Sequence, residues 1–468
     1  MRKARLLLVG LLGLCLVAAS GVPAQVQKAG QAAKPGPSVK PVIIPIKEYK
    51  LKNGLRVILS EDHSAPTYSI CVTYNVGSRD ERKGRTGFAH LFEHMMFQGS
   101  ENVGKGEHFI LIFNNGGGLN GTTSEDRTNY FQTLAANQLD LGLFLEADRM
   151  RSLVINQANL DNQRHAVQEE RRLGIDNQPY GKTFEAISET AYDNFAYKHL
   201  VIGSMEDLNA ATVEDVAQFF KTYYAPNNAV LTMVGDFKSA EALARIGKYF
   251  EGIPAQPPPS APDMTEPEQK GERRKTLEDN FAQTPRIDIV YKIPPGNTPD
   301  FYAMDVLMDI LVAGQSSRLY QKLVKEKEVA VGVFGGAGER RGTALARFGI
   351  MVRPGKDFAE IEKLVYDEIE RIKKEPVEDW ELQKIRLMNR RGRVQALRSS
   401  LFRTILISQW TVFYNDPNLI NKIESKINAV TKQDLQRVAQ AYLKDTNRSV
   451  ITTVPKPRSP AAGRPAAD

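Results

Sequence analysis

The chain has 468 residues, of which 42% are hydrophobic and 25% are charged, which is typical of a soluble globular protein with more than one domain. Its formal net charge of +7 comes from basic residues near the two ends, and residues 41–455 are close to neutral. A near-neutral central region gives no reason to expect nucleic acid as a partner.

The first 24 residues have the parts of a secretory signal peptide. A basic start, MRKAR, precedes an apolar run from Leu6 to Ala19, and small residues follow at Val22-Pro23-Ala24. The run is short for a membrane span. We therefore expect a signal peptide at residues 1–24, no stable membrane anchor after its removal, and export across the inner membrane to the periplasm.

The two ends of the mature chain, at 25–40 and 456–468, have the composition of a disordered leader and a disordered tail. After the leader, the strand-like runs IKEYKL and LRVILS flank Lys52-Asn53-Gly54, a sequence typical of a hairpin turn. A further strand-like run, SICVTYNV, contains Cys71, the one cysteine outside the signal peptide, so no disulfide within the chain is expected.

The segment GFAHLFEHMMF at 87–97 is predicted to form an apolar helix that carries three ionisable side chains. His90, Glu93 and His94 have the spacing i, i+3, i+4 and therefore share one helical face. Two imidazoles one turn apart can bind one Zn²⁺, whereas burying a polar group without a partner costs about 2–7 kcal/mol. The apolar flanks thus favour a metal site over a solvated helix with a surface ion pair, and His-x-x-Glu-His is a known zinc signature.

A catalytic zinc site needs a third protein ligand and keeps one position open. The helical segment RHAVQEERRLGIDN supplies two candidates, Glu169 and Glu170, and spacing alone does not choose between them. The chain has six histidines, and the four outside the predicted metal helix are expected to be surface or structural residues.

A segment at 253–276, rich in Pro and charge, is expected to link an N-terminal domain at 41–252 to a C-terminal domain at 277–455. The second domain contains the strand-like runs RIDIVYKI and ARFGIMV and helical patterns at 360–374 and 379–414.

The two halves share a matching segment, TVEDVAQFFKTYYAPNN at 212–228 and TKQDLQRVAQAYLKDTN at 431–447. Each copy opens with Thr-x-x-Asp, an acidic variant of the capping box, continues as an amphipathic helix and runs into a strand-like segment. The match lies at the same place in two halves of similar length, which indicates duplication. We expect an α+β fold of two related domains, each an antiparallel sheet packed with helices.

Four segments of the first half resemble, in sequence and in order, the pitrilysin–insulysin family of inverted-zincin metallopeptidases. They are VGSRDE, TGFAHLFEHMMFQGS, GGGLNGTTSEDRTNY and AVQEERR. The resemblance extends over nearly the whole mature chain and is greatest to the short members, which are similar to mitochondrial processing peptidase subunits and bacterial zinc peptidases. It implies two processing-peptidase-like domains, of which the first is catalytic.

The resemblance also implies the roles of the residues in the first domain. His90, His94 and Glu170 would bind one Zn²⁺ per chain, and Glu93 would be the general base of a zinc-dependent metalloendopeptidase. This chemistry is coherent, because zinc lowers the pKa of bound water to about 7 and a nearby carboxylate can then accept its proton.

The stretch Asn120-Gly121-Thr122-Thr123 resembles the family's Asn-Ala-x-Thr edge strand, to which the substrate adds as an extra strand. The resemblance implies that Asn120, Gly121, Thr122 and Thr123 bind substrate, in a mode that contacts mainly the peptide backbone and suits unfolded peptides. Gly121 stands where the family has alanine. The resemblance places Gln163 beside the zinc ligands, where it replaces a glutamate of the family seven residues before the third ligand; this replacement bears on the tuning of the ligands and not on zinc binding.

The second half resembles the family in GQSSRLYQKLVKEKEVAVGV, at 314–333, but lacks two of its functional side chains. Active single-chain members carry an Arg and, seven residues later, a Tyr, which hold the substrate backbone and stabilise the oxyanion. The matching residues here are Val324 and Val331, which cannot donate a hydrogen bond. We therefore expect a heterodimer with a related secreted subunit that supplies the Arg/Tyr pair and closes a chamber around peptide substrates.

Two other functions are compatible with parts of this pattern. One is a homodimeric zinc peptidase with another oxyanion donor, and the other is a non-catalytic scaffold similar to the core subunits of the respiratory cytochrome bc complex. The complete set of four predicted zinc-site residues favours a peptidase over a scaffold.

Overall fold

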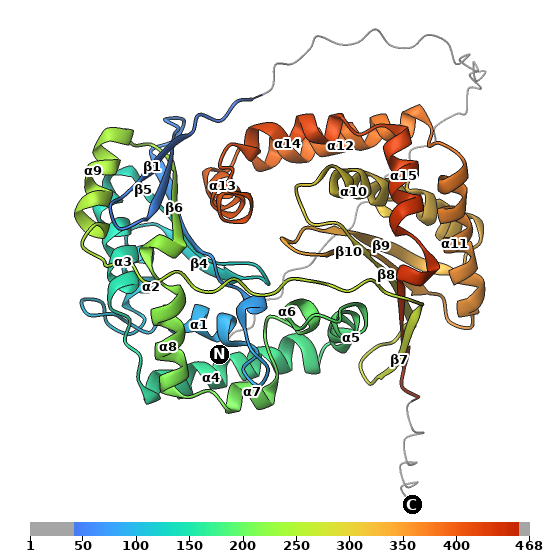
Figure 1. The fold of residues 1–468 in the computed structure, drawn as a ribbon, viewed down its shortest axis with the longest axis horizontal. Coiled ribbons are helices and arrows are strands. Elements are labelled where there is room, and N and C mark those ends of the chain that lie inside the picture. The colour runs from blue at the N-terminus through green and yellow to red at the C-terminus, as the bar shows by residue number, and fades with distance from the viewer. Residues whose placement is uncertain (1–41, 458–468) are drawn as a thin grey trace, which may run out of the picture. The chain divides into compact units, whose positions relative to one another are not determined.

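The computed structural model describes residues 42–457, so the predicted signal peptide at 1–24, the leader at 25–40 and the tail beyond residue 457 lie outside the described residues. Residues 43–457 belong to one compact unit, which contains two sheets (Figure 1). No helix in this described range is long and apolar enough to cross a membrane.

The first half forms a six-stranded sheet with order β1-β2-β6-β3-β5-β4. Neighbouring strands are antiparallel except β2 and β6, which are parallel. The strands are β1 Lys47–Lys50, β2 Arg56–Glu61, β3 Thr67–Tyr74, β4 Gly118–Thr123, β5 Thr128–Ala135 and β6 Ala229–Gly235. The helices are α1 Phe88–Met95, α2 Glu107–Asn114, α3 Leu139–Arg151, α4 Gln157–Arg171, α5 Gly181–Ala191, α6 Phe195–Lys198, α7 Met205–Asn209, α8 Val213–Tyr223 and α9 Ser239–Phe250.

The second half forms a five-stranded sheet with order β7-β11-β8-β10-β9, in which β7 and β11 are parallel and the other pairs antiparallel. The strands are β7 Arg273–Asp279, β8 Arg286–Ile293, β9 Ala330–Gly338, β10 Ala344–Val352 and β11 Arg448–Pro455. The helices are α10 Pro299–Val312, α11 Phe358–Lys374, α12 Asp379–Ala396, α13 Ser400–Tyr414, α14 Leu419–Asn428 and α15 Lys432–Tyr442.

The predicted duplication and the α+β class are confirmed. From β2 to β4 the first sheet has the same strand order and directions as the second from β7 to β9. The matched helices α8 and α15 both begin with the predicted capping box, formed by Thr212 with Asp215 and by Thr431 with Asp434. The sheets are mixed, not wholly antiparallel as expected, because β6 and β11 each return after a long helical excursion that allows a parallel partner.

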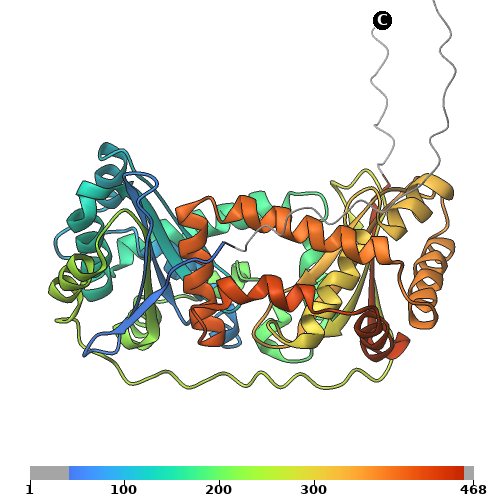
Figure 2. The ribbon, with the colours of Figure 1, turned by 90° about the horizontal axis from the view of Figure 1, so that it is seen from above.

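Two predicted boundaries differ from the structure. Residues 254–270 contain no helix or strand and follow an extended path between α9 and β7 (Figure 2). Strand β7 nevertheless begins at Arg273, inside the segment expected to be linker. The limits of the two domains at 252 and 277 stay predictions. The helix expected at 379–414 is two helices, because Ser399 caps α13 by accepting a hydrogen bond from the backbone N–H of Phe402.

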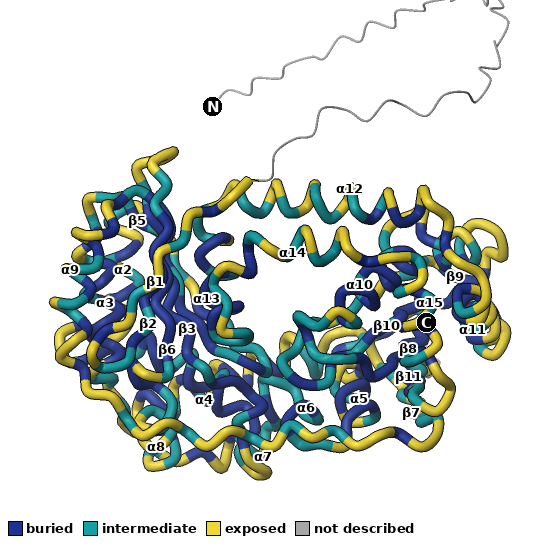
Figure 3. The backbone as a smooth tube through the Cα atoms, turned by 45° about the horizontal axis from the view of Figure 1, so that its top comes forward, coloured by how far each residue is buried: buried dark blue, intermediate teal, exposed yellow. Residues whose placement is uncertain are grey.

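Each sheet is covered on one face by a helix from the other half. Helix α13 packs on β3 and β6, and α5 packs on β7, β8 and β11. Ser408 of α13 donates a hydrogen bond to Thr73 of β3 at 2.7 Å, and the Thr183 and Thr453 hydroxyl groups, on α5 and β11, are also 2.7 Å apart. Strands β3 and β6 are therefore buried along nearly their whole length, as Figure 3 shows in dark blue.

The β9–β10 loop of the second half contacts the β4–β5 hairpin of the first. Asp126, at the tip of that hairpin, is buried and accepts hydrogen bonds from Arg79, from Tyr197 and from the backbone N–H of Arg341. Arg340 forms an ion pair with Glu125 at 2.5 Å. The hairpin that ends β4 is therefore held by both halves of the chain.

Candidate metal centre and active site

Helix α1 forms within the predicted segment, at Phe88–Met95, and has the predicted apolar flanks. Its buried side chains pack into the core of the first half, and only its polar face is partly exposed. The buried residues are Phe88, Ala89, Leu91, Phe92 and Met95, and the partly exposed ones are His90, Glu93 and His94. The helix thus presents all three ionisable side chains on its one accessible face.

The start of α1 is held by Glu81, a residue that the sequence analysis did not single out. The helix begins after Gly87, which has a φ of 85° and no side chain to cap the helix. Glu81 accepts hydrogen bonds from the backbone N–H groups of Gly87 at 2.9 Å and Ala89 at 2.8 Å, and His199 Nε2 lies 2.9 Å from the same carboxylate. A carboxylate at this end also stabilises the helix dipole, so this pair positions the helix that carries His90 and His94.

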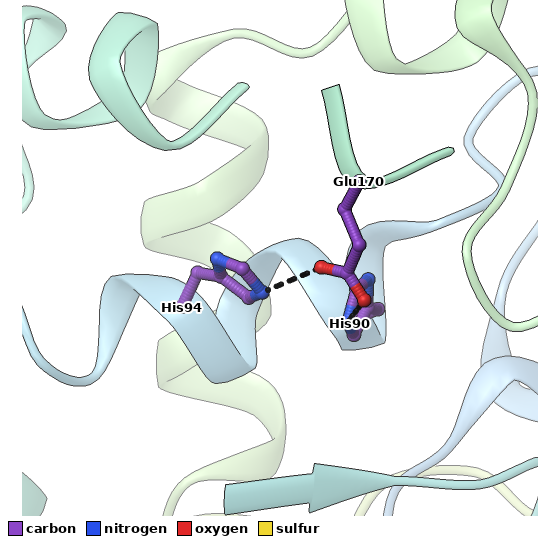
Figure 4. A group of neighbouring side chains, drawn as sticks. All are labelled: His90, His94 and Glu170. Carbon is purple, nitrogen blue, oxygen red and sulfur yellow. Dashed lines mark ion pairs between the residues drawn. The ribbon is translucent and has the colours of Figure 1, made fainter. Parts of the chain in front are cut away.

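The structure brings the three predicted ligands together (Figure 4). Glu170, in the last turn of α4, places one carboxylate oxygen 3.7 Å from His90 Nε2 and the other 3.4 Å from His94 Nε2. The three ligand atoms lie within 4.8 Å of one another. Ligand atoms at about 2.0–2.1 Å from a tetrahedral zinc would be about 3.4 Å apart, so this donor set fits Zn²⁺ with little adjustment.

The electrostatics of the three side chains also suit a cation. Burial, together with the nearby His94 ring, lowers the pKa of His90 to about 4, so its imidazole is neutral, the form that binds a metal. Burial is the largest influence on His94 and favours its neutral form, but the hydrogen bond to Glu170 and the charges of Glu170 and Glu93 together outweigh it and raise the pKa of His94. Hydrogen bonding to His94 in turn lowers the pKa of Glu170. A positive charge is thus favoured between helix α1, which carries His90 and His94, and helix α4, which carries Glu170.

The structure separates Glu170 from Glu169, which spacing alone could not do. Glu170 points at α1, whereas Glu169 is exposed and pairs with Arg172 at 3.0 Å. Gln163, about two turns before Glu170 on α4, places its side-chain oxygen 3.3 Å from His94 Nδ1. A partner on the second ring nitrogen orients a ligand histidine, so Gln163 lies where it can fix the His94 ring.

Glu93 faces strand β4. Thr123 donates a hydrogen bond to Glu93 Oε2 at 2.5 Å, and a Cβ atom added to Gly121 would lie 2.9 Å from Glu93 Cγ and 3.1 Å from Oε1. Burial raises the pKa of Glu93, although the hydrogen bond from Thr123 opposes the rise. One oxygen of Glu93 is therefore held by Thr123, while the other lies beside Gly121 and accepts no hydrogen bond from the described residues.

Strand β4 is an edge of its sheet and pairs only with β5. Ser124 N–H bonds to Arg127 C=O, so in this antiparallel pair Thr122 and Asn120 turn their backbone groups inward, and Thr123 and Gly121 turn theirs outward. Consistent with this, the Gly121 N–H is not used by β5 and bonds to Asn120 Oδ1 at 2.9 Å. The open edge beside Glu93 can therefore accept another strand.

The second half offers no comparable site in the described residues. All six histidines of the chain lie before residue 200, and α10, which follows β8 as α1 follows β3, contains none. Val324 lies in a π-helical turn at Tyr320–Glu326, and Val331 is exposed on the edge strand β9. The remaining histidines are not part of the ligand cluster. His63 and His165 are exposed, His108 is buried against Gln132, and His199 pairs with Glu81.

Comparison with known proteins agrees with the fold. Residues 56–204 match the family described as "Insulinase (Peptidase family M16)", and residues 210–389 match the one described as "Peptidase M16 inactive domain". The chain therefore belongs to the M16 family of peptidases. The first match contains the predicted zinc ligands, and the second covers much of the half that lacks them.

Three individual proteins show how far the similarity extends. The chain is 30% identical over 408 residues to "Zinc protease PqqE" of Helicobacter pylori, covering 86% of this chain and 92% of the relative. It is 28% identical over 217 residues, 44% of each chain, to the mitochondrial-processing peptidase subunit beta of Bos taurus. The crystal structure of a protease from Helicobacter pylori superimposes with a TM-score of 0.84 at 30% identity, over 88% of this chain and 100% of that chain.

Proposed function

We propose that the chain is the zinc-bearing subunit of a metalloendopeptidase that hydrolyses unfolded peptides or short polypeptides. The observation that carries this proposal is the convergence of His90, His94 and Glu170 on one point beside Glu93 and an open strand edge. Membership of the M16 family and similarity to a zinc protease support it.

In this proposal His90, His94 and Glu170 hold one Zn²⁺ per chain, and Gln163 fixes the ring of His94. A bound zinc ion polarises a carbonyl group and lowers the pKa of water to about 7. Glu93 takes the proton of the attacking water and later gives it to the leaving amine. Thr123 restrains one oxygen of Glu93 so that the other can face the water.

The peptide substrate adds to the open edge of β4. The outward backbone groups of Gly121 and Thr123 pair with the substrate, and Asn120 releases the Gly121 N–H when the substrate arrives. Because Thr123 also contacts Glu93, the paired stretch of substrate passes next to the general base. Backbone pairing suits unfolded chains, since a folded substrate has few free backbone groups.

The second subunit is proposed from what this chain lacks. Loss of one oxyanion donor typically costs about 10²–10³ in rate, and Val324 and Val331 cannot serve as donors. A related secreted subunit that carries the Arg/Tyr pair would complete the chamber. We place the complex in the periplasm, on the basis of the signal-like segment at 1–24.

The Glu93→Gln variant tests the proposed chemistry. An amide cannot accept the proton of water, so the variant should keep zinc and lose cleavage of an unstructured peptide. Glu169→Gln is the matched control, because it neutralises an exposed carboxylate that does not face the ligands, and it should cleave normally. Full turnover by Glu93→Gln would contradict the mechanism. A zinc-loaded wild-type complex that cleaves no unstructured peptide would instead favour the scaffold function.

A further inference from the structure

Arg127 lies in the turn of the β4–β5 hairpin and forms no ion pair with a described carboxylate. Its Nη1 donates to the backbone oxygen of Thr122 at 2.6 Å and to the hydroxyl of Thr122 at 2.5 Å. Its Nε donates to Gln409 of α13 at 3.3 Å, and Asn129 Oδ1 is a weaker acceptor for Nη1 at 3.3 Å. All of these acceptors are neutral, so no described carboxylate pairs directly with the guanidinium.

Arg127 is partly exposed, and the partly exposed Arg341 and Arg386 likewise have only neutral hydrogen-bond partners for their side chains among the described residues. Arg127 differs, however, from the five buried arginines of the described residues. Each of those has a carboxylate within ion-pair distance: Arg79 with Asp126, Arg149 with Glu146, Arg171 with Glu185, Arg286 with Asp288 and Arg403 with Asp62. No described carboxylate lies within that distance of Arg127, and burial lowers the pKa of its guanidinium. Glu93, Glu125 and Asp126 act on the guanidinium only from beyond ion-pair distance, so a carboxylate that pairs with it directly would stabilise the partly buried charge further.

Arg127 also retains a free donor group. Its Nη2 makes no hydrogen bond to the described residues, and it is not among the fully buried unpaired nitrogens, as Arg149 Nη1 is. A second pair of N–H donors is thus open to solvent. Together with the fixed Nη1, it gives the guanidinium a defined orientation over strand β4.

The position of Arg127 follows from the alternation of side chains along β4. Gly121 and Thr123 face Glu93, so Thr122 faces the opposite side of the sheet, where α13 lies. In a strand added to β4, the residue opposite Thr122 points to this same side, with Cβ atoms about 4.5–5.5 Å apart. The substrate residues on either side of it face Glu93, so the substrate residue opposite Thr122 lies within about two residues of the cleaved bond.

We infer that Arg127 forms a substrate subsite for a carboxylate and gives the enzyme a preference for an Asp or Glu side chain next to the cleaved bond. This inference rests on the proposed function, because it assumes that substrate adds to β4. Nη2 of Arg127 donates to the substrate carboxylate, and the neutral contacts of Nη1 and Nε hold the guanidinium in place. The guanidinium, which has no direct carboxylate partner among the described residues, then gains one in the complex.

Equilibrium binding tests the subsite without requiring turnover. The zinc-loaded Glu93→Gln protein, with its partner subunit if the two purify together, is titrated into labelled unstructured peptides that carry Glu or Gln at successive positions. At one position Glu should bind about tenfold more tightly than Gln, the size expected for a hydrogen bond between charged groups. The preference should weaken between about 50 mM and about 500 mM NaCl, since salt screens charges.

Two variants and a control locate the effect. Arg127→Gln should abolish the preference for Glu while keeping affinity for the Gln peptide, and Arg127→Lys should retain part of the preference. Arg82→Gln is the control, because it removes an exposed arginine, paired with Asp215, away from β4 and should change nothing. If Arg127→Gln does not fold, Arg127→Lys and the salt dependence of the wild-type preference still decide.

An unchanged Glu preference in Arg127→Gln, or no preference at any position in the wild type, overturns the subsite. A preference that depends on Arg127 in a protein whose zinc-loaded wild type cleaves no peptide leaves the subsite standing. That result would instead overturn the peptidase function, so the two failures are distinguishable.

Discussion

The Gly121→Ala variant should slow catalysis without harming the fold. Gly121 lies on β4 against Glu93, and its φ is not positive, so alanine fits the backbone there. Replacing glycine at a compatible position stabilises a protein by about 0.4–1 kcal/mol, because the unfolded chain loses freedom.

The size of the effect follows from the space around the added methyl group. Its Cβ would lie 2.9 Å from Glu93 Cγ, 3.1 Å from Oε1 and 3.3 Å from Cδ, whereas ordinary contacts begin at 3.4 Å. Glu93 must therefore withdraw by about half an ångström. A misplacement of about 1 Å can cost 10²-fold in rate, so we expect kcat to fall about tenfold.

The measurement compares Gly121→Ala with Gly118→Ala on the same strand. A Cβ atom at Gly118 meets nothing within 4 Å, so this control has the same chemical change without the contact. Steady-state cleavage of a fluorogenic unstructured peptide gives kcat and KM, and zinc per chain and the melting temperature are measured on the same samples. Zinc content and KM should be unchanged in both variants, and only Gly121→Ala should lose kcat.

Two results would refute this reasoning. A kcat of Gly121→Ala within twofold of wild type would mean that Glu93 is not held by β4 in the working enzyme. An equal loss in Gly118→Ala would mean that the strand tolerates no side chain for reasons unrelated to Glu93.

Three further predictions concern the supports of the site. The pKa of His199 in the folded protein is raised above its ordinary 6.5. Its pairing with Glu81 therefore stabilises the fold fully below pH 6.5, and this stabilisation is lost as the pH rises through the folded pKa. Over that pH interval the unfolding free energy of His199→Gln should fall less than that of the wild type. Asp126→Ala should lower the unfolding free energy in urea by about 3–5 kcal/mol, because it leaves buried donors unpaired. The double variant Val324→Arg, Val331→Tyr should give measurable peptide cleavage by the chain without a partner. No gain in cleavage would contradict the proposal that the chain lacks oxyanion donors.

The sequence alone predicts the parts of this protein that are encoded locally. The spacing of His90, Glu93 and His94 places them on one helical face, and the Thr-x-x-Asp boxes mark the starts of α8 and α15. Such features depend only on helical periodicity and on side-chain to backbone bonds within a few residues.

Features that depend on distant contacts could not be read in this way. The choice of Glu170 over Glu169 depends on how α4 packs on α1, and the cap of α1 by Glu81 depends on a loop that returns to the helix. The sequence does not predict that α5 packs on the sheet of the second half or that α13 packs on the sheet of the first half. Both helices are simply amphipathic or apolar, and such a pattern does not say which sheet a helix covers. The neutral contacts of Arg127 also depend on distant packing, since Gln409 lies on α13 in the other half of the chain.

The most direct test of the central claim is the zinc content of the purified protein. Elemental analysis of the mature wild-type chain should give one zinc per chain, Glu169→Ala should keep it, and His94→Ala and Glu170→Ala should each lose it, because two remaining ligands hold the ion weakly. Undiminished zinc in His94→Ala would contradict the assignment of the metal site and, with it, the proposed catalytic centre.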